Sequence, residues 1–315
     1  QACMEKGWCK GHPQKHEYPI RTVVVGKDQP DKLPIVLVHG FMMGAACFYK
    51  WYPLLSKEHK VYAIDVIGMG GSGSPPFDAD SVTPEQAEKL LVEPFMNWAQ
   101  KMGLQKFVLL GHSFGGFVSS AWATREPEKI AQLGLLSPLL GFTDTRLNSF
   151  QERAQDSWQR KAVFSVFETA WSSHMTPQTI VRWIPGAESF FRKNAERRFG
   201  RAKNLSEEEG KLLAEYVVAT MLTPASLEAA ATVCFEPFCK PVELEDGTIK
   251  TRLSNLKMPI FAIYGDHDWM DRATSEELPN CKFLTLGDSG HHVYFDNPED
   301  LTTLTLGEIS ATVSM

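Results

Sequence analysis

The chain has 315 residues, of which 43% are hydrophobic and 22% are charged. This composition is typical of a globular protein, and it excludes a disordered chain, a collagen-like chain and a disulfide-dense mini-protein. The 32 basic and 38 acidic residues give a net charge of −6. Because proteins that bind the phosphate backbone usually carry a basic excess, we expect no nucleic-acid partner.

The six cysteines show neither the spacing of a metal site nor that of a disulfide framework. Two pairs are close in the sequence, Cys3 with Cys9 and Cys234 with Cys239, so a local disulfide within either pair remains an alternative. The glycine motif at 68–73 matches a dinucleotide fingerprint but does not open a helix. We therefore expect no metal and no other cofactor. Since the sequence starts at Gln1, we expect any targeting signal to lie outside it. We favour an intracellular protein, with association to a membrane or an organelle as an open alternative.

Short apolar runs alternate with helical patterns along the chain. Because the runs are apolar throughout, they indicate parallel strands covered on both faces. The predicted strands are 21–26, 34–39, 60–66, 106–111, 132–137, 259–265 and 281–287. Predicted helices run from the capping box at Thr83 to about residue 102, over 114–126, and onward from Asn297-Pro298. The alternation predicts an α/β protein with an open, mostly parallel sheet and helices on both faces.

The stretch 107–124 contains no Asp, Glu, Lys or Arg, and its length alone would suit a membrane span. Its centre is interrupted by His112, Ser113, Gly115 and Gly116. We interpret it as a buried strand followed by a buried helix, and we expect no transmembrane segment.

Residues 140–256 break the alternation, since they show helical patterns and no convincing strand. We predict a helical cap at 140–256, inserted into a core formed by 21–139 and 257–315, with 1–20 as an N-terminal extension. Its large apolar residues either pack the cap on the sheet or line an apolar pocket of lipid size. They are Phe150, Trp158, Phe164, Phe167, Trp171, Met175, Trp183, Phe190, Phe191 and Met221.

A basic stretch lies inside the predicted cap. Residues 192–203 (RKNAERRFGRAK) hold six basic residues and one acidic residue. Such a stretch is either a solvated helix face or a contact for phosphate and anionic lipid headgroups. A peripheral contact between the cap and an anionic membrane is thus one of two interpretations of this stretch, and a solvated helix face is the other.

The clearest chemical signal is Gly111-His112-Ser113-Phe114-Gly115, which follows a predicted strand and precedes a predicted helix. That context defines a nucleophile elbow, in which small neighbours let a serine sit on a sharp turn. We predict Ser113 as a catalytic nucleophile. A serine needs a general base, and the base needs an orienting carboxylate.

Both partners follow strands later in the chain. The strand at 259–265 leads to three acids, of which we predict Asp268 as the orienting carboxylate, with Asp271 and Asp266 as alternatives. The strand at 281–287 leads to His291 and His292, and we predict His291 as the base. Because carboxyl ends of parallel strands meet at one sheet edge, these side chains should gather beside Ser113.

Backbone N–H groups complete the predicted site. The strand at 34–39 leads to Gly40, Phe41 and Met42. We predict the N–H groups of Phe41 and Phe114 as the oxyanion hole, with Met42 as the alternative to Phe41. Such donors contribute about 3–4 kcal/mol each to the transition state.

Five motifs carry a resemblance to the α/β-hydrolase superfamily, which extends from about Arg21 to the last helix. They are VLVHGF (36–41), DVIGMGGSG (65–73), GHSFGG (111–116), YGDHDWMD (264–271) and GHHVYFDNPED (290–300). The His-x4-Asp spacing of His291 and Asp296, with residues 215–228, is similar to abhydrolase-domain-containing proteins four and five and their plant and fungal relatives. That branch implies lipid acyl chemistry, namely phospholipid deacylation, lysophospholipid acyl transfer or coactivation of a lipase.

The leading hypothesis is a serine hydrolase that cleaves a lipid acyl ester of the phospholipase or lysophospholipase type. A second is a lysophospholipid acyltransferase, which the resemblance ties to Asp296, although Asp296 and Asn297 could instead cap the last helix. A third is a small-ester or carbon–carbon bond hydrolase of the same fold, and a fourth is a lipid-binding regulator with a vestigial triad. Ser113 argues against dehalogenases and epoxide hydrolases, which need Asp at that position.

Overall fold

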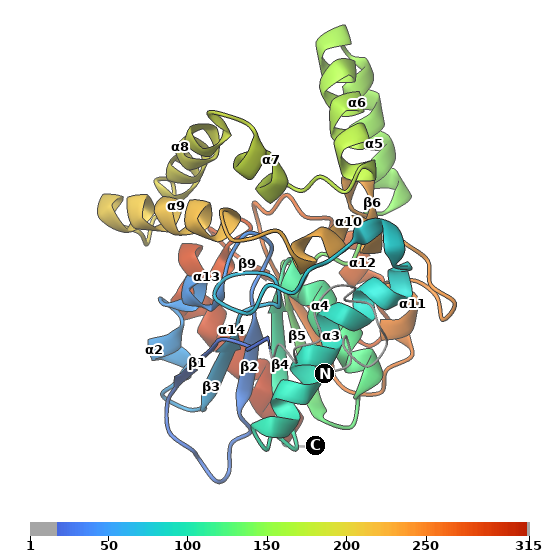
Figure 1. Cartoon of the computed structure of the whole chain (residues 1–315). Coiled ribbons are helices and arrows are strands. Elements are labelled where there is room, and N and C mark those ends of the chain that lie inside the picture. Colours follow the sequence, from blue (N-terminus) through green and yellow to red (C-terminus); the bar gives the residue numbers. More distant parts are fainter. Residues whose placement is uncertain (1–17, 314–315) are drawn as a thin grey trace.

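A seven-stranded sheet forms the centre of the structure, a computed structural model that describes residues 18–313 (Figure 1). The strand order is β1-β3-β2-β4-β5-β8-β9. β1 runs antiparallel to β3, and every other neighbouring pair is parallel. The strands are β1 (Thr22–Val25), β2 (Ile35–Val38), β3 (Val61–Ile64), β4 (Phe107–His112), β5 (Ile130–Leu136), β8 (Ile260–Gly265) and β9 (Cys281–Leu286). The predicted mostly parallel sheet is confirmed. Cys3, Cys9 and most of the predicted extension lie outside the described residues.

Alternate residues of the central strands pack into two different apolar cores. On β2, Val36 and Val38 join the core on one face, whereas Ile35 and Leu37 join the core on the other. All four side chains are fully buried. Burial on both faces explains why the strand sequences are apolar throughout instead of alternating.

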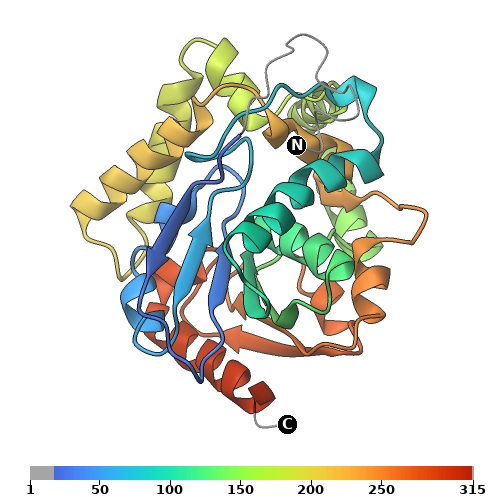
Figure 2. The same ribbon diagram turned by 60° about the horizontal axis from the view of Figure 1, so that its bottom comes forward.

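Helices cover both faces of the sheet (Figure 2). One face is covered by α3 (Pro84–Lys101), α4 (Phe114–Arg125), α10 (Ala230–Cys234) and α11 (Ile249–Ser254). The other is covered by α2 (Tyr52–Leu55), α13 (Val293–Asp296) and α14 (Pro298–Val313). Short helices η1 (Ala45–Phe48), η2 (Ala79–Ser81) and α12 (Ala273–Glu276) lie in loops. The capping box at Thr83 is present, as the sequence predicts.

Most of the helices between β5 and β8 lie beyond one end of the sheet (Figure 1). They are α5 (Asp144–Gln155), α6 (Trp158–Ser172), α7 (Pro177–Trp183), α8 (Ala187–Phe199), α9 (Glu207–Met221), η3 (Leu227–Ala229) and η4 (Pro237–Cys239). Two strands of two residues, β6 (Phe235–Glu236) and β7 (Lys240–Pro241), pair with each other. Sequence periodicity missed them because two residues are too few to show a period.

Several aromatic residues of this region lie at the surface. Trp158, Phe167, Trp183 and Phe190 are 75%, 40%, 74% and 64% exposed. Neither predicted role, packing on the sheet or lining a pocket, fits these four. Cys234 and Cys239 are free thiols, so the local disulfide is not formed.

The charge-free stretch at 107–124 forms β4 and most of α4, as predicted. Among the described residues, no helix is both long and apolar enough to cross a membrane.

Candidate active site

Ser113 lies in a sharp turn between β4 and α4. Its φ of 54° and ψ of −119° are unusual for a residue with a side chain. A Cβ on Gly111 would lie 2.4 Å from the Gly115 carbonyl oxygen, and one on Gly115 would lie 2.4 Å from the carbonyl oxygens of Val38 and His39. Only glycine fits at these two positions, so the sequence around Ser113 is dictated by close backbone approach.

The structure brings Ser113, His291 and Asp268 together at the carboxyl end of the sheet. His291 Nε2 lies 3.0 Å from Ser113 Oγ, and His291 Nδ1 lies 3.1 Å from Asp268 Oδ1. The Asp268 side chain is 1% exposed and that of His291 is 10% exposed. Burial opposes ionisation of Asp268, but the hydrogen bond from His291 and its charge hold the pKa of Asp268 below its usual value.

The alternative acids and the alternative base have other partners. Asp266 accepts hydrogen bonds from the backbone N–H groups of Asp288 and Ser289. Asp271 Oδ2 accepts from the backbone N–H and hydroxyl of Thr143, at 2.8 and 2.7 Å. His292 is buried, which holds its pKa well below the usual value. Of these groups, only Asp268 and His291 extend the hydrogen-bonded row that begins at Ser113.

The loop after β2 packs directly on Ser113. A Cβ on Gly40 would lie 3.0 Å from Ser113 Cβ, and the rings of Phe41 and Phe114 meet edge to face at 5.5 Å. Phe114 is the first residue of α4, so its N–H has no partner inside the helix. The predicted oxyanion donors thus belong to adjacent segments, and the choice between Phe41 and Met42 stays a prediction.

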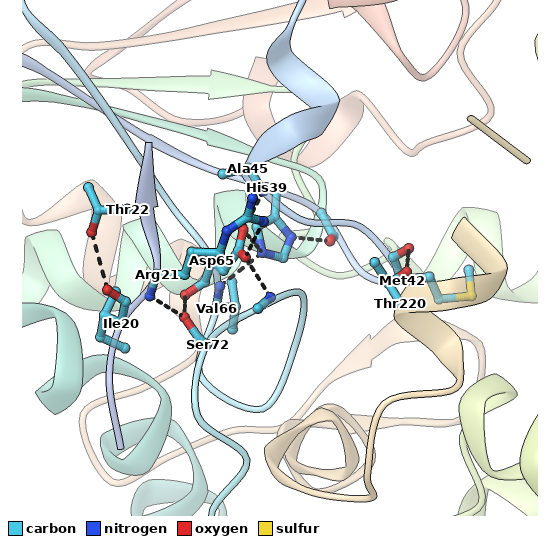
Figure 3. A network of polar contacts seen from close by, with 12 residues as sticks. Ile20, Arg21, Thr22, His39, Met42, Ala45, Asp65, Val66, Ser72 and Thr220 are labelled. Carbon is cyan, nitrogen blue, oxygen red and sulfur yellow. Dashed lines mark hydrogen bonds and ion pairs between the residues drawn. The ribbon is translucent and has the colours of Figure 1, made fainter. Parts of the chain in front are cut away.

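A buried carboxylate fixes the loop that carries Phe41 (Figure 3). Asp65, directly after β3, is fully buried. It accepts hydrogen bonds from the backbone N–H groups of Ala45 and Gly71 and pairs with Arg21 Nη1 at 3.3 Å. From the other side, Thr220 Oγ1 on α9 donates to the Met42 carbonyl oxygen at 2.7 Å. Contacts on both sides restrict the loop that packs on Ser113.

His39 supports the same loop as a neutral ring. Its Nε2 accepts from the backbone N–H of Val66 at 2.9 Å, so its Nδ1 carries the proton and donates to the Gly40 carbonyl oxygen at 2.8 Å. Burial lowers the pKa of His39, which agrees with this neutral tautomer.

His112 is a site residue to which sequence analysis gave no role. Its Nε2 donates to the backbone carbonyl oxygen of His291 at 2.9 Å. Burial, with a smaller effect of nearby His291, lowers the pKa of His112 to about 3, so the ring is neutral at pH 7. Only its position beside Ser113 hinted at a role, because the contact spans 179 residues of sequence.

The Asp296 side chain does not cap the last helix. Asn297 Oδ1 accepts from the backbone N–H of Asp300 and caps α14 instead. The Asp296 side chain turns inward and pairs with Arg198 of α8 at 3.0 Å. A cap needs an acceptor aimed at the first helical turn, and Asn297 lies closer to it.

Half of the basic stretch is engaged in ion pairs. Arg192 pairs with Glu188 and Glu215, Arg198 with Asp296, and Lys203 with Asp288. Lys193, Arg197 and Arg201 are exposed. Only these three remain available for an anionic surface.

Ser113 lines neither of two hollows in the described part of the chain. The larger, about 430 Å³, lies between η2, the end of α6 and α10, and includes Trp171 and Phe235 in its wall. Phe235 stacks edge to face on Phe117 of α4 at 4.8 Å. Within the same described residues, no group of three or more His, Cys, Asp or Glu side chains could hold a metal ion.

The sequence model of one family, described as the alpha/beta hydrolase fold, matches residues 34–298. The chain therefore belongs to the alpha/beta hydrolase fold family.

Curated relatives of this chain carry names from lipid metabolism. It is 31% identical to a "Probable 1-acylglycerol-3-phosphate O-acyltransferase" of Oryza sativa subsp. japonica, over 89% of this chain and 67% of the relative. It is 30% identical to the "(Lyso)-N-acylphosphatidylethanolamine lipase" of Homo sapiens, over 89% of this chain and 80% of the relative.

Solved structures agree on the fold. A thermophilic esterase from Thermogutta terrifontis superposes with a TM-score of 0.64 at 20% identity, covering 96% of this chain and 97% of the esterase. A membrane phospholipase A described as a bacterial virulence factor gives a TM-score of 0.63 at 19% identity, covering 93% of this chain and 83% of that one. At these identities the likeness shows the fold alone.

Proposed function

We propose that this protein is a serine hydrolase that cleaves the acyl ester of a phospholipid or lysophospholipid. The observation that carries the proposal is the hydrogen-bonded row from Ser113 through His291 to Asp268. Such a row turns a poorly nucleophilic hydroxyl into a reactive one, because the base removes its proton during attack.

In the proposed reaction, Ser113 Oγ attacks the ester carbonyl while His291 Nε2 takes the hydroxyl proton. Asp268 holds the ring with Nδ1 protonated and stabilises the imidazolium that forms. The N–H groups of Phe41 and Phe114 bind the oxyanion. His291 then protonates the leaving alcohol, and the acyl group stays on Ser113. Water, deprotonated by His291, hydrolyses the acyl-enzyme and restores Ser113.

Two observations support a lipid substrate. The lipase and acyltransferase named above act on phospholipid-like molecules according to their names. In addition, large aromatic side chains are exposed on the helices next to the site, including Trp183 and Phe190. A small-ester or carbon–carbon bond hydrolase would have no need of such a surface.

Acyl transfer is the second candidate, favoured by the acyltransferase names among the relatives. In that reaction a lysophospholipid hydroxyl takes the place of water in the last step. The same nucleophile, base and oxyanion donors serve both outcomes, so the acceptor decides between them.

The decisive test labels the intact protein with a fluorophosphonate probe, which reacts with activated serines. We expect labelling of the wild type and turnover of a phospholipid or lysophospholipid panel, both lost in Ser113→Ala. Ser119→Ala is the matched control, because its buried hydroxyl has no hydrogen-bond partner in the described structure. A well-folded wild type that resists labelling would support a lipid-binding regulator with a vestigial triad.

We also propose that α7 and α8 contact an anionic membrane. Phe190, Lys193 and Arg197 follow one another at helical spacing on α8, so they share one face. All three are exposed, as is Trp183 at the end of α7. Aromatic rings beside basic side chains suit the boundary between headgroups and acyl chains.

A further inference from the structure

Asp296 is a nearly buried acid that the proposed reaction does not use. It ends α13, and its side chain is 8% exposed. Its Oδ2 accepts from the backbone N–H of Gly290 at 2.9 Å and from Arg198 Nη2 at 3.0 Å. Its backbone oxygen accepts from Asn204 Nδ2 at 2.6 Å. Asp296 therefore joins the loop after β9 to the segment that contains α8 and the turn after it.

Asp296 accepts a hydrogen bond from the residue that directly precedes the proposed base. Gly290 precedes His291, whose own carbonyl oxygen accepts from His112 Nε2 at 2.9 Å. The backbone around His291 is thus fixed on one side by Asp296 and on the other by His112. With its backbone fixed, the ring can bridge Ser113 and Asp268, which lie 3.0 and 3.1 Å away.

The contacts of Asp296 argue against proton transfer by this acid. No hydrogen bond joins its carboxylate to Ser113 or to the His291 ring in the described part of the chain. The carboxylate oxygen that faces the loop already accepts from two donors. An acid in this arrangement can hold the base in place but has no reacting atom within reach.

We propose that Asp296 is a positioning residue for His291 and that Arg198 of α8 holds Asp296 in place. The His-x4-Asp spacing then reflects the one turn of α13 that brings the acid back to the base's own loop. The ion pair also makes the position of His291 sensitive to the position of α8. This inference rests on the proposed role of His291 as the base, and it assigns Asp296 no separate role in acyl transfer.

The test compares Asp296→Asn, Asp296→Ala and Arg198→Met in the full chain. Asp296→Asn keeps an acceptor for Gly290 but loses the charge, so we expect kcat to fall about tenfold on a short soluble ester. Asp296→Ala loses both contacts, and we expect about a hundredfold loss, the scale of a small misplacement of a catalytic group. KM should stay within about threefold, because the substrate is not touched.

Two further readouts separate positioning from a merely structural role. The double variant Arg198→Met with Asp296→Asn should lose no more kcat than the more impaired single variant, because both changes break the same Arg198–Asp296 contact. Arg198→Lys should restore part of the lost kcat. Lys203→Met is the matched control: Lys203 also links this segment to the His291 loop, through Asp288, but that pair is 70% and 73% exposed. We expect it to match the wild type.

Acyl transfer gives the outcome that would overturn the inference. With a lysophospholipid acceptor, the ratio of transfer to hydrolysis should be the same in the Asp296 variants and the wild type. A selective loss of transfer would show that Asp296 takes part in that reaction. Fluorophosphonate labelling of Asp296→Ala and Arg198→Met at the wild-type rate would refute positioning. An unlabelled wild type would instead count against the proposed function, so the two failures are distinguishable.

Discussion

At the scale of single residues, the proposed catalytic triad depends on which of three nearby acids, Asp266, Asp268 or Asp271, faces the His291 ring. Asp266 and Asp271 tie down loops through backbone contacts, whereas Asp268 meets the His291 ring. The sequence predicted the row because the carboxyl ends of parallel strands converge. It could not exclude the two other acids, since that choice depends on how a six-residue loop turns.

Replacing Asp268 with Asn should lower kcat by about 10³- to 10⁴-fold, because the ring loses its orienting charge and its correct tautomer. The measurement is steady-state turnover of a short soluble ester. Asp266→Asn, a change in the same loop, should remain within about tenfold of the wild type. Equal losses in the two variants would contradict the assignment of Asp268.

The neutral His112 ring predicts a pH dependence of stability. Its pKa is lowered to about 3 in the folded protein, whereas an unfolded chain takes up the proton near pH 6.5. The free energy of unfolding should therefore fall as the pH drops below 6.5, by about 2 kcal/mol at pH 5 from this group alone. In His112→Gln, which keeps a donor for the His291 carbonyl, the fall should be shallower. Urea unfolding measures the free energy of unfolding of both proteins at pH 7 and pH 5. An equal fall in His112→Gln and the wild type would contradict this role of His112.

At the scale of elements, a buried ion pair joins α3, α4 and α11. Arg252 donates to both Glu88 oxygens, at 2.8 and 2.5 Å, and Arg125 donates to one of them. The Glu88 and Arg252 side chains are 2% and 6% exposed. Burial opposes ionisation of Glu88, but the two guanidinium groups hold the pKa of this carboxyl below its usual value.

Glu88→Ala should lower the free energy of unfolding by about 3–5 kcal/mol, because it leaves the buried Arg252 with only a longer contact of 3.6 Å to the exposed Asp246. Chemical denaturation measures the loss. The neighbouring change Lys89→Ala breaks a solvent-accessible pair with Glu93, whose two side chains are 43% and 25% exposed, and should cost less than about 0.5 kcal/mol. Similar losses in the two variants would be inconsistent with a structural role for the buried pair.

Elements with a clear period or cap could be predicted from the sequence, and those that depend on distant contacts could not. The sheet strands follow from apolar runs, and α3 follows from its capping box at Thr83. The exposure of Trp183 and Phe190 was not predictable, because an aromatic residue in a helix is usually buried. The Arg198–Asp296 pair joins residues 98 positions apart and leaves no local signal.

At the scale of the whole molecule, the helices α6, α7 and α8, which carry the exposed Trp158, Phe167, Trp183 and Phe190, lie beyond one end of the sheet (Figure 1). Ser113 lies at the carboxyl end of β4, in the turn before α4. Docking of α7 and α8 on a bilayer would therefore bring the proposed nucleophile toward lipid. The net charge of −6 opposes binding to anionic lipid, so a local basic group is needed.

Replacing Lys193, Arg197 and Arg201 with Gln should weaken binding to phosphatidylserine vesicles by roughly 10²-fold at low salt, since each charge contributes about 1 kcal/mol near the surface. Trp183→Ser with Phe190→Ser should weaken binding to neutral vesicles as well. Co-sedimentation measures both. Lys211→Gln on α9, which removes an exposed charge paired with Glu207, is the matched control. Unchanged binding in the triple variant would refute the proposed contact.

The backbone of Ser113 has a consequence for how such a site evolves. A side-chain-bearing residue held at a φ of 54° and a ψ of −119° costs on the order of 1–3 kcal/mol of folding stability. Glycine at that position would relieve the strain and remove the nucleophile in one step. Loss of the proposed activity is thus thermodynamically downhill for this fold, and only selection for the reaction keeps a serine at the turn.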